Sequence, residues 1–308
     1  MNVLSLFDGM SCGQQALERN GVRVNNYFAS EIDKYAIKVT QANYPKTKQL
    51  GSVIDVDGYL LPNIDLLLGG SPCQSFSFAG KRKGMSTKDE QEILTLEYYL
   101  ELKLEGFEFE GESYLFWEYM RLLKELKPKY FLLENVMMGN KWEKILSKAI
   151  GVNPIEINSS LVSAQNRRRL YWTNIGMITG GLFGDLQSII QQPKDKGILL
   201  KDVIEEDVDD KYYLKDDSFV FDRIKNDHPF TPRIPKVNEK SNCLTIGGSG
   251  CNDLINNSKI RRLTPVECER LQTVKENYTN CVSDTQRHKM LGNGWTVDVI
   301  SHILNYMK

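Results

Sequence analysis

The sequence predicts an α/β fold with a parallel sheet, and three observations lead to that prediction. Within residues 1–150, short apolar runs typical of buried strands alternate with longer stretches of helical periodicity. Each apolar run is followed directly by a glycine or an acidic residue. The 308 residues are enough for one large or two modest domains with a full hydrophobic core. Strands that alternate with helices imply right-handed βαβ units and a sheet covered on both faces.

The expected elements follow in order along the chain. We expect strands at Val3–Phe7, Tyr27–Ser30, Asp65–Leu68 and Tyr130–Leu133. We expect helices near Gln14–Asn20, Asp33–Asn43, Ser113–Leu126, Pro265–Leu271 and Thr296–Met307. Gly21, Pro45 and Pro128 end the first three helices. Thr264 followed by Pro265 is typical of a helix start, with threonine as the N-cap.

Composition indicates an ordinary globular protein. Its 41% hydrophobic and 26% charged residues are close to the averages for soluble domains. No apolar run approaches the roughly 20 residues that span a bilayer, and the first residues are too short and too uncharged for a signal peptide. We therefore expect a cytoplasmic protein with no membrane partner.

Cysteine and histidine spacing gives no support for a metal site. The six cysteines include no Cys-x-x-Cys pair, and the three histidines are spread over the last third of the chain. Neither a disulfide framework nor a zinc site fits this pattern. We expect no metal.

The formal net charge of −1 does not indicate a nucleic-acid partner, but the charges are unevenly distributed. Residues 89–118 hold ten Asp or Glu against one Lys, and residues 223–262 hold eight Lys or Arg against three acids. A polyanion is repelled by the first stretch and attracted by the second. Solvated surface is the simpler interpretation of the acidic stretch, and we expect it to face away from a polyanion.

The regular alternation of elements ends near residue 176, where Thr179-Gly180-Gly181 marks a break. A polar region punctuated by proline follows to about residue 260, which predicts a second, smaller domain. Helical periodicity then returns. We therefore divide the chain into residues 1–176, 177–260 and 261–308.

Cys73 follows a strand-like run and the turn Gly69-Gly70-Ser71-Pro72. Ligands of open α/β sheets gather beyond the carboxyl ends of the strands, so a cysteine there is placed to react. The alternative is a small buried hydrophobe, since free cysteine is among the most buried residue types. The segment by itself does not decide between the two.

Three other strand ends add chemistry at the same edge. The glycines of residues 7–13 allow a nucleoside-type ligand to lie against a helix N-terminus, and Glu31 is placed for ribose hydroxyls. A thiolate at Cys73 and a carboxylate at Glu134 suggest addition to an electron-poor ring with neutralisation of its developing charge. Nearby cations lower a thiol pKa. The candidates are Arg167 and Arg169, although a solvated charge run also explains that cluster.

With these residues in place, the chain resembles a DNA cytosine-5 methyltransferase of the prokaryotic or phage type. The resemblance covers residues 3–176 and about 259–304, in the motif order of that family. The matching motifs are Pro72-Cys73-Gln74, Glu134-Asn135-Val136, Gln165-x-Arg167-x-Arg169, Arg262-Leu263-Thr264-Pro265 and Gly292-Asn293-Gly294. Each motif alone is a weak pattern, and five in one order are specific.

The resemblance implies a Rossmann-like, S-adenosylmethionine-dependent methyltransferase sheet with a smaller target-recognition domain at 177–260, and with 261–308 returning to the catalytic domain. It implies methyl transfer to C5 of a flipped cytosine in a specific duplex DNA sequence through a covalent Cys73 adduct. Glu134 would hold N3 and the exocyclic amine of the base. Arg167 would position the base or its backbone, and Arg169 would support Glu134 or the nucleophile loop.

The resemblance also assigns the S-adenosylmethionine site, with two departures. This chain has Gly9-x-Ser11-Cys12 where the family commonly has Gly-x-Gly-Gly, a variant similar to the animal de novo branch. Ser52 stands where the family usually has an Asp that touches the adenine, so either Ser52 or Asp55 fills that role. The implied cofactor residues are Phe7, Asp8, Gly9, Met10, Glu31, Ile32, Ser52, Asp55, Pro72, Asn293 and Gly294.

Residues 74–85 resemble the family's mobile loop that closes over DNA, and residues 177–260 match no pattern strongly, as expected of a sequence reader. The expected DNA contacts are Gln74, Ser75, Lys81, Arg82, Lys83, Gln165 and Thr245. We expect a monomer on double-stranded DNA, in a restriction-modification setting. Two alternatives stay open: a cytosine-5 methyltransferase of transfer RNA, and a catalytically silent binding protein.

Overall fold

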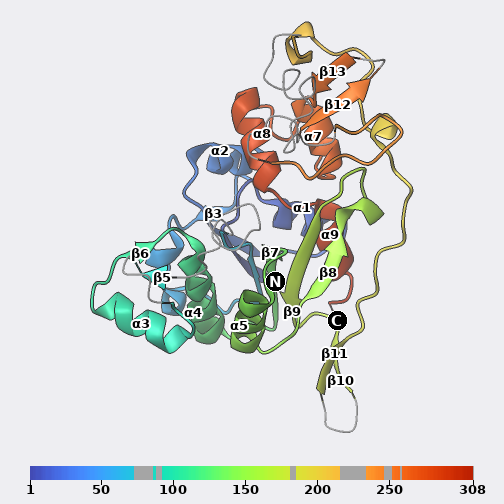
Figure 1. The fold of residues 1–308 in the computed structure, drawn as a ribbon. Coiled ribbons are helices and arrows are strands. Elements are labelled where there is room, and N and C mark those ends of the chain that lie inside the picture. Colours follow the sequence, from blue (N-terminus) through green and yellow to red (C-terminus); the bar gives the residue numbers. More distant parts are fainter. Residues whose placement is uncertain are drawn as a thin grey trace.

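A single large sheet organises the chain (Figure 1). The computed structural model describes residues 1–72, 86–87, 92–180, 185–215, 234–245, 252–256 and 259–307. The sheet has seven strands in the order β3-β2-β1-β4-β7-β9-β8. Their bounds are β1 (Asn2–Leu6), β2 (Asn26–Ser30), β3 (Lys48–Gln49), β4 (Leu66–Gly69), β7 (Tyr130–Val136), β8 (Ile155–Asn158) and β9 (Arg168–Thr173).

The first five strands in that order are parallel, which confirms the expected α/β fold. From β1 the chain moves outward to β2 and β3, then returns to place β4 on the other side of β1. The carboxyl ends of β1 and β4 therefore flank a topological switch point, where open α/β sheets bind ligands. Strands β9 and β8 run antiparallel to their neighbours and were not expected.

Helices cover both faces of the sheet. They are α1 (Cys12–Arg19), α2 (Lys34–Asn43), α3 (Leu96–Leu104), α4 (Phe116–Leu126), α5 (Asn140–Ile150), α7 (Pro265–Leu271), α8 (Asp284–Asn293) and α9 (Val297–Leu304). The five expected helices are confirmed, with ends shifted by a few residues. Helices α3, α5 and α8 were not expected.

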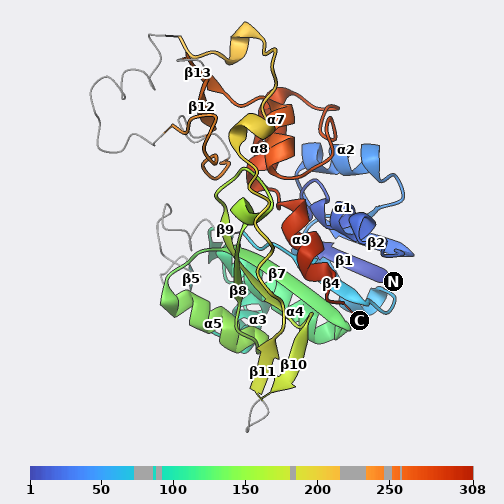
Figure 2. The ribbon, with the colours of Figure 1, turned by 90° about the vertical axis from the view of Figure 1, so that its right-hand side faces the viewer.

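Alternate residues of the strands pack into separate clusters, because successive side chains of a strand point to opposite faces. Val3 and Leu68 pack in the cluster that contains residues of α1 and α9. Leu4 and Leu67 pack in the cluster that contains residues of α4 and α5. Figure 2 shows α1 and α9 on one side of the sheet and α4 and α5 on the other. Burial on both faces explains why β1, β2, β4 and β7 are mostly apolar.

The last helix returns to the first one. Asn20, at the end of α1, donates to the Ser301 carbonyl oxygen in α9 at 2.8 Å, and Arg19 forms an ion pair with Asp298. The segment after residue 260 therefore completes the same core that the first residues begin.

Two hairpins in the described parts of residues 177–260 lie far apart from each other. Figures 1 and 2 show the hairpin of β10 (Met177–Gly180) and β11 (Asp185–Ser188) at one end of the molecule. The hairpin of β12 (Asp253–Asn256) and β13 (Lys259–Arg262) lies at the other end, beside α7 and α8. A further small hairpin joins β5 (Ser86–Thr87) to β6 (Phe109–Glu110). Within the described residues, no helix has the length and apolarity to cross a membrane.

Two charged residues of the acidic and basic stretches are buried and do not contribute to the surface charge that the sequence led us to expect. Glu118, in the acidic stretch, is fully buried in α4 and accepts hydrogen bonds from Tyr99 at 2.5 Å and Arg121 at 2.6 Å. Arg261, in the basic stretch, is fully buried against Glu267. Each charge is buried because a partner from another turn or element neutralises it, which a count of charges cannot reveal.

The Arg261–Glu267 pair ties β13 to the start of α7. Both Glu267 oxygens accept from the guanidinium, at 2.8 and 2.6 Å. The same carboxylate accepts from the Thr264 backbone N–H at 2.8 Å, and Thr264 Oγ1 accepts from the Glu267 N–H at 3.2 Å. This capping box satisfies two donors at the helix start.

We expect Glu267→Gln to lower the free energy of unfolding by roughly 3–5 kcal/mol, because it leaves the Arg261 charge buried without its counter-ion. Urea denaturation would measure the loss. Glu97→Gln is the control, since the Glu97–Lys124 pair is exposed (74% and 56% of the side chains) and should give no measurable change. Equal small losses in the two variants would show that the buried pair is not required for stability.

Candidate active site

The turn after β1 is held in an unusual backbone conformation. Phe7, Gly9 and Ser11 have φ values of +56°, +57° and +63°, in the left-handed region that only glycine adopts readily. Such strained residues collect at ligand sites when the surroundings fix them. A Cβ placed on Gly9 would meet nothing within 4 Å, so space lies beside this backbone.

The Glu31 carboxylate is oriented by the same turn. It accepts from the Gly9 N–H at 2.8 Å through one oxygen, and from the N–H groups of Ile32 and Asp33 at 2.8 Å through the other. The end of β2 is thereby joined to the end of β1. Next to it, 74% of the Ile32 side chain is exposed, which is uncovered apolar surface suited to a flat ring.

Asp8 lies beneath the turn. It accepts from Ser11 Oγ at 2.6 Å and from Tyr27 Oη at 2.8 Å. Burial raises the pKa of Asp8 to about 6, even though the hydrogen bonds from Ser11 and Tyr27 act in the opposite direction.

The raised pKa of Asp8 predicts a pH-dependent stability. A carboxyl group whose folded pKa exceeds its unfolded value near 4 binds its proton more tightly when folded. Its stabilising contribution is complete below about pH 4 and is lost as the pH rises through about 6. Relative to Asp8→Asn, the wild-type free energy of unfolding should therefore fall by on the order of 2 kcal/mol between about pH 4.5 and about pH 7.5. Urea denaturation of both proteins at about pH 4.5 and about pH 7.5 would measure the change. A constant difference between the proteins would contradict it.

The other expected cofactor residues near this turn differ in how far they are exposed. Ser52 caps the short helix η1 (Val53–Asp55) by accepting from the Ile54 N–H at 3.4 Å, and Asp55 is exposed. Asn293 is exposed at the end of α8. Met10 differs from expectation: its side chain is 1% exposed, and its carbonyl oxygen accepts from Tyr278 Oη at 2.8 Å. Its side chain belongs to the core because α8 packs over it, and a Cβ on Gly294 would lie 2.8 Å from Met10 Cε.

The end of β7 carries the candidate acid. Glu134 is 9% exposed. Its Oε1 lies 2.9 Å from Arg169 Nε, and its Oε2 accepts from Trp295 Nε1 at 3.2 Å. The structure thus places Arg169 beside Glu134, which is one of the two positions that the resemblance implies for it.

The turn after β4 is fixed to the end of β7. Asn135 Nδ2 donates to Ser71 Oγ at 3.1 Å, and both side chains are buried. A Cβ on Gly70 would lie 3.3 Å from Glu134 Oε2, so the turn passes close to the carboxylate. Pro72 ends this described segment. The expected residues Cys73, Gln74, Ser75, Lys81, Arg82 and Lys83 lie outside the described residues.

Arg167 joins three segments that are far apart in the sequence. It is 4% exposed, and its guanidinium donates to the carbonyl oxygens of Leu244 at 3.3 Å, Gly292 at 3.2 Å and Gly294 at 3.0 Å. Its donors therefore hold protein backbone, because a buried guanidinium must satisfy its N–H groups locally. The contact to the base or its backbone that the resemblance implies stays a prediction.

Gln165 is a correction. We expected a DNA contact, but the side chain is fully buried, donates to the Leu271 carbonyl oxygen at 3.2 Å and accepts from the Leu244 N–H at 2.9 Å. It holds the segment Ser241–Thr245 against the catalytic sheet. Thr245 is half-buried, and its Oγ1 has no hydrogen-bond partner within the part of the chain that the structure describes.

Sequence reasoning missed three side chains of this site: Asn135, Trp295 and Gln272. Gln272 donates to the Leu291 and Gly294 carbonyl oxygens at 2.7 and 3.0 Å, beside the Arg167 contacts. The signal that could have indicated two of them is their position within or beside a matching motif. Asn135 follows Glu134, and Trp295 follows Gly292-Asn293-Gly294.

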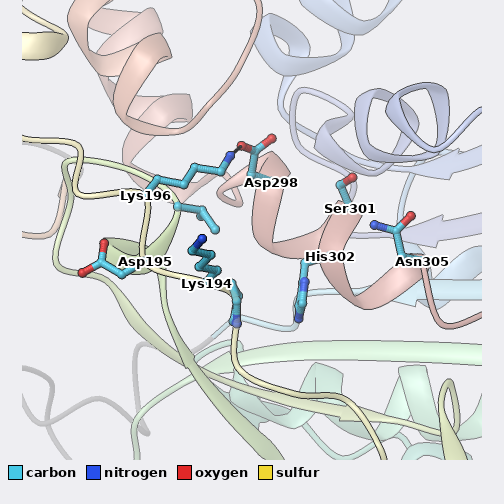
Figure 3. A pocket seen from close by; sticks show the side chains of 9 residues that line it. Lys194, Asp195, Lys196, Asp298, Ser301, His302 and Asn305 are labelled. Carbon is cyan, nitrogen blue, oxygen red and sulfur yellow. Dashed lines mark hydrogen bonds and ion pairs between the residues drawn. The ribbon is translucent and has the colours of Figure 1, made fainter.

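The described surface also has a hollow away from this edge. It lies between α9 and the segment before Lys196 (Figure 3). Lys196 is neutralised there by Asp298 at 2.7 Å, and none of the expected site residues lines the hollow. No cluster of three metal-ligating side chains occurs among the residues that the structure describes.

Comparison with known proteins agrees with the fold and with the family that the sequence motifs resemble. The family of C-5 cytosine-specific DNA methylases matches this chain over residues 1–234 and 186–308. The chain belongs to this family. Its activity is methyl transfer to C5 of cytosine, and the family implies DNA as the substrate and S-adenosylmethionine as the methyl donor.

Individual relatives share most of the chain. The type II methyltransferase M1.ScrFI of Lactococcus lactis subsp. cremoris is 30% identical over 92% of this chain and 72% of that protein. The orphan methyltransferase M.SPRI of Bacillus phage SPR is 33% identical over 70% of this chain, and the match spans about half (53%) of that protein. A solved methyltransferase of Entamoeba histolytica has a TM-score of 0.72 at 15% identity, covering 99% of this chain and 97% of the other. That likeness establishes the shared methyltransferase fold.

Proposed function

We propose that the protein methylates cytosine at C5 within a specific sequence of duplex DNA, through a covalent intermediate on Cys73. The observation that carries the proposal is the Glu134 carboxylate. Arg169 and Trp295 hold it beside the turn that leads to Cys73. An oriented carboxylate next to a candidate nucleophile is what addition to a cytosine ring requires.

The reaction follows from these two groups. The Cys73 thiolate would add to C6 of the flipped base while the Glu134 carboxyl group gives a proton to N3 and accepts from the exocyclic amine, so that the charge brought by the thiolate is neutralised and C5 becomes electron-rich. Bound S-adenosylmethionine would supply an electrophilic methyl group to C5 and leave as S-adenosylhomocysteine. Loss of the C5 proton to water, return of the N3 proton to Glu134 and departure of the thiolate from C6 would restore the aromatic ring and free the enzyme. Flipping the base costs a few kcal/mol, which contacts to DNA must offset.

The turn after β1 and the end of β2 are the proposed S-adenosylmethionine site. The open backbone at Gly9 and the exposed face of Ile32 offer space and apolar surface. Glu31 presents a carboxylate to ribose hydroxyls while its oxygens remain anchored by backbone N–H groups. Ser52 and Asp55 both remain candidates for the adenine contact, because Ser52 Oγ keeps a second lone pair and Asp55 is exposed.

Residues 177–260 are the proposed target-recognition domain, between a catalytic domain at 1–176 and a return segment at 261–308. The described piece that lies nearest the site is Ser241–Thr245, which Gln165 and Arg167 bind directly. The residues 74–85 are proposed to contact DNA phosphates through Lys81, Arg82 and Lys83. We propose a monomer on DNA.

A labelled-methyl transfer assay tests the proposal. Duplex DNA and transfer RNA would be offered separately, with label expected in DNA only. Bisulfite sequencing of DNA from cells that express the chain would then identify the modified cytosines and their sequence context. Label in RNA alone would overturn the proposed substrate, and no label in either would favour a silent binding protein.

A further inference from the structure

Trp295 lies where three elements of the catalytic sheet meet. Its indole Nε1 would be 2.9 Å from a Cβ on Gly70, at the end of β4. Its Cζ3 would be 3.8 Å from a Cβ on Gly13, in the first turn of α1. The two glycines leave room for the ring, because any larger residue at Gly70 would have to displace it. One side chain therefore spans from the start of α1, past β4, to Glu134 on β7.

The backbone on both sides of Trp295 is firmly held. The carbonyl oxygen of Gly294 accepts from Arg167 Nη2 and from Gln272 Nε2, both at 3.0 Å. Thr296 is 1% exposed, and its Oγ1 donates to Gln272 Oε1 at 2.8 Å. The direction of the indole N–H is thus fixed by the junction between α8 and α9.

Among the residues that the structure describes, each oxygen of Glu134 has one positioned partner. Arg169 Nε lies 2.9 Å from Oε1 as an ion pair, and Trp295 Nε1 donates a hydrogen bond to Oε2 at 3.2 Å. A carboxyl group offers about four hydrogen-bonding positions, so positions remain for a base. The hydrogen bond from Trp295 is directional and restricts rotation of the carboxyl plane. Its loss would release that rotation.

We propose that Trp295 is a positioning residue for methyl transfer, acting through Glu134. Its indole N–H fixes the plane of the carboxyl group toward the base. The inference rests on the proposed role of Glu134. It also gives the return segment a function in the reaction, because that segment supplies the hydrogen-bond donor on Oε2.

Trp295→Phe tests the proposal, since it removes the N–H and keeps most of the ring. We expect kcat to fall about tenfold, with the KM values for DNA and for S-adenosylmethionine within about threefold of wild type. A side chain that only supports the fold would lower stability without this selective loss of kcat, so the split between kcat and KM separates the two roles. Calorimetry should show unchanged S-adenosylmethionine binding.

Trp172→Phe is the matched control. Trp172 is fully buried on this sheet, and its indole hydrogen bond goes to Ser147 Oγ at 2.9 Å and not to Glu134. This variant should lose stability and keep the wild-type kcat.

Three outcomes would overturn the inference: an unchanged kcat in Trp295→Phe, the same fall in kcat in both variants, or weakened S-adenosylmethionine binding that accounts for the loss of rate. If wild-type protein transfers no methyl group, the proposed function fails before this test begins, so the two failures are distinguishable.

Discussion

Cys73→Ser is expected to abolish methyl transfer while DNA binding survives. The covalent step needs a thiolate, and a serine hydroxyl is far too weakly acidic to form the corresponding anion beside the site. We expect the rate to fall by roughly 10³-fold or more. Binding should persist, because the phosphate and base contacts do not depend on the sulfur atom.

Single-turnover methyl transfer and a gel-shift assay on the same duplex would measure the two properties separately. Cys281→Ser is the control, since Cys281 is a free, half-buried cysteine between α7 and α8. It should retain transfer. Substantial transfer by Cys73→Ser would show that the methyl group reaches C5 without this covalent adduct.

Glu134→Gln is expected to reduce kcat by roughly 10²–10³-fold, the usual effect of removing one group that stabilises developing charge. The amide has nearly the same shape but no acidic proton, so it cannot neutralise the negative charge that builds on N3 as the thiolate adds. It also leaves the guanidinium of Arg169 without its ion pair at 2.9 Å. The rate of a single turnover, with DNA and S-adenosylmethionine saturating, is the quantity to measure.

A matched control lies on the neighbouring strand pair. Glu156 forms an exposed ion pair with Arg168 at 2.5 Å, one residue from Arg169, on the β8–β9 hairpin. Glu156→Gln should leave the rate within about twofold of wild type, as exposed pairs contribute little. Similar losses in the two variants would indicate a general effect on the hairpin, and the role of Glu134 would have to be abandoned.

Local patterns predicted the central sheet well. The runs that became β1, β2, β4 and β7 are apolar at nearly every position, because both faces of each strand are buried. The less regular elements were missed for a physical reason. Helix α8 buries only Arg287, Met290, Leu291 and Gly292 and is otherwise polar, so its periodicity is weak. The antiparallel hairpin β8–β9 depends on its pairing with β7, which no local pattern contains.

The residues of the candidate site also divide into those that the sequence predicted and those that it did not. Glu31 directly follows β2 and Glu134 lies near the end of β7. Parallel strands bring their carboxyl ends to one edge, so the sequence was sufficient to group them. Asn135, Gln272 and Trp295 were not predicted. Their roles depend on hydrogen bonds to segments that lie 22 to 161 residues away in the chain.

The sequence by itself determined the α/β sheet, the family motifs and the edge at which the chemistry gathers, because these depend on local periodicity and on the order of residues. Only the tertiary structure decided what each polar side chain binds. It placed Gln165 and Met10 in the core, directed Arg167 to backbone carbonyl oxygens, and paired Trp295 with Glu134. The physical reason is that a buried polar group must find its partners among whatever segments pack around it, and those segments come from distant parts of the chain.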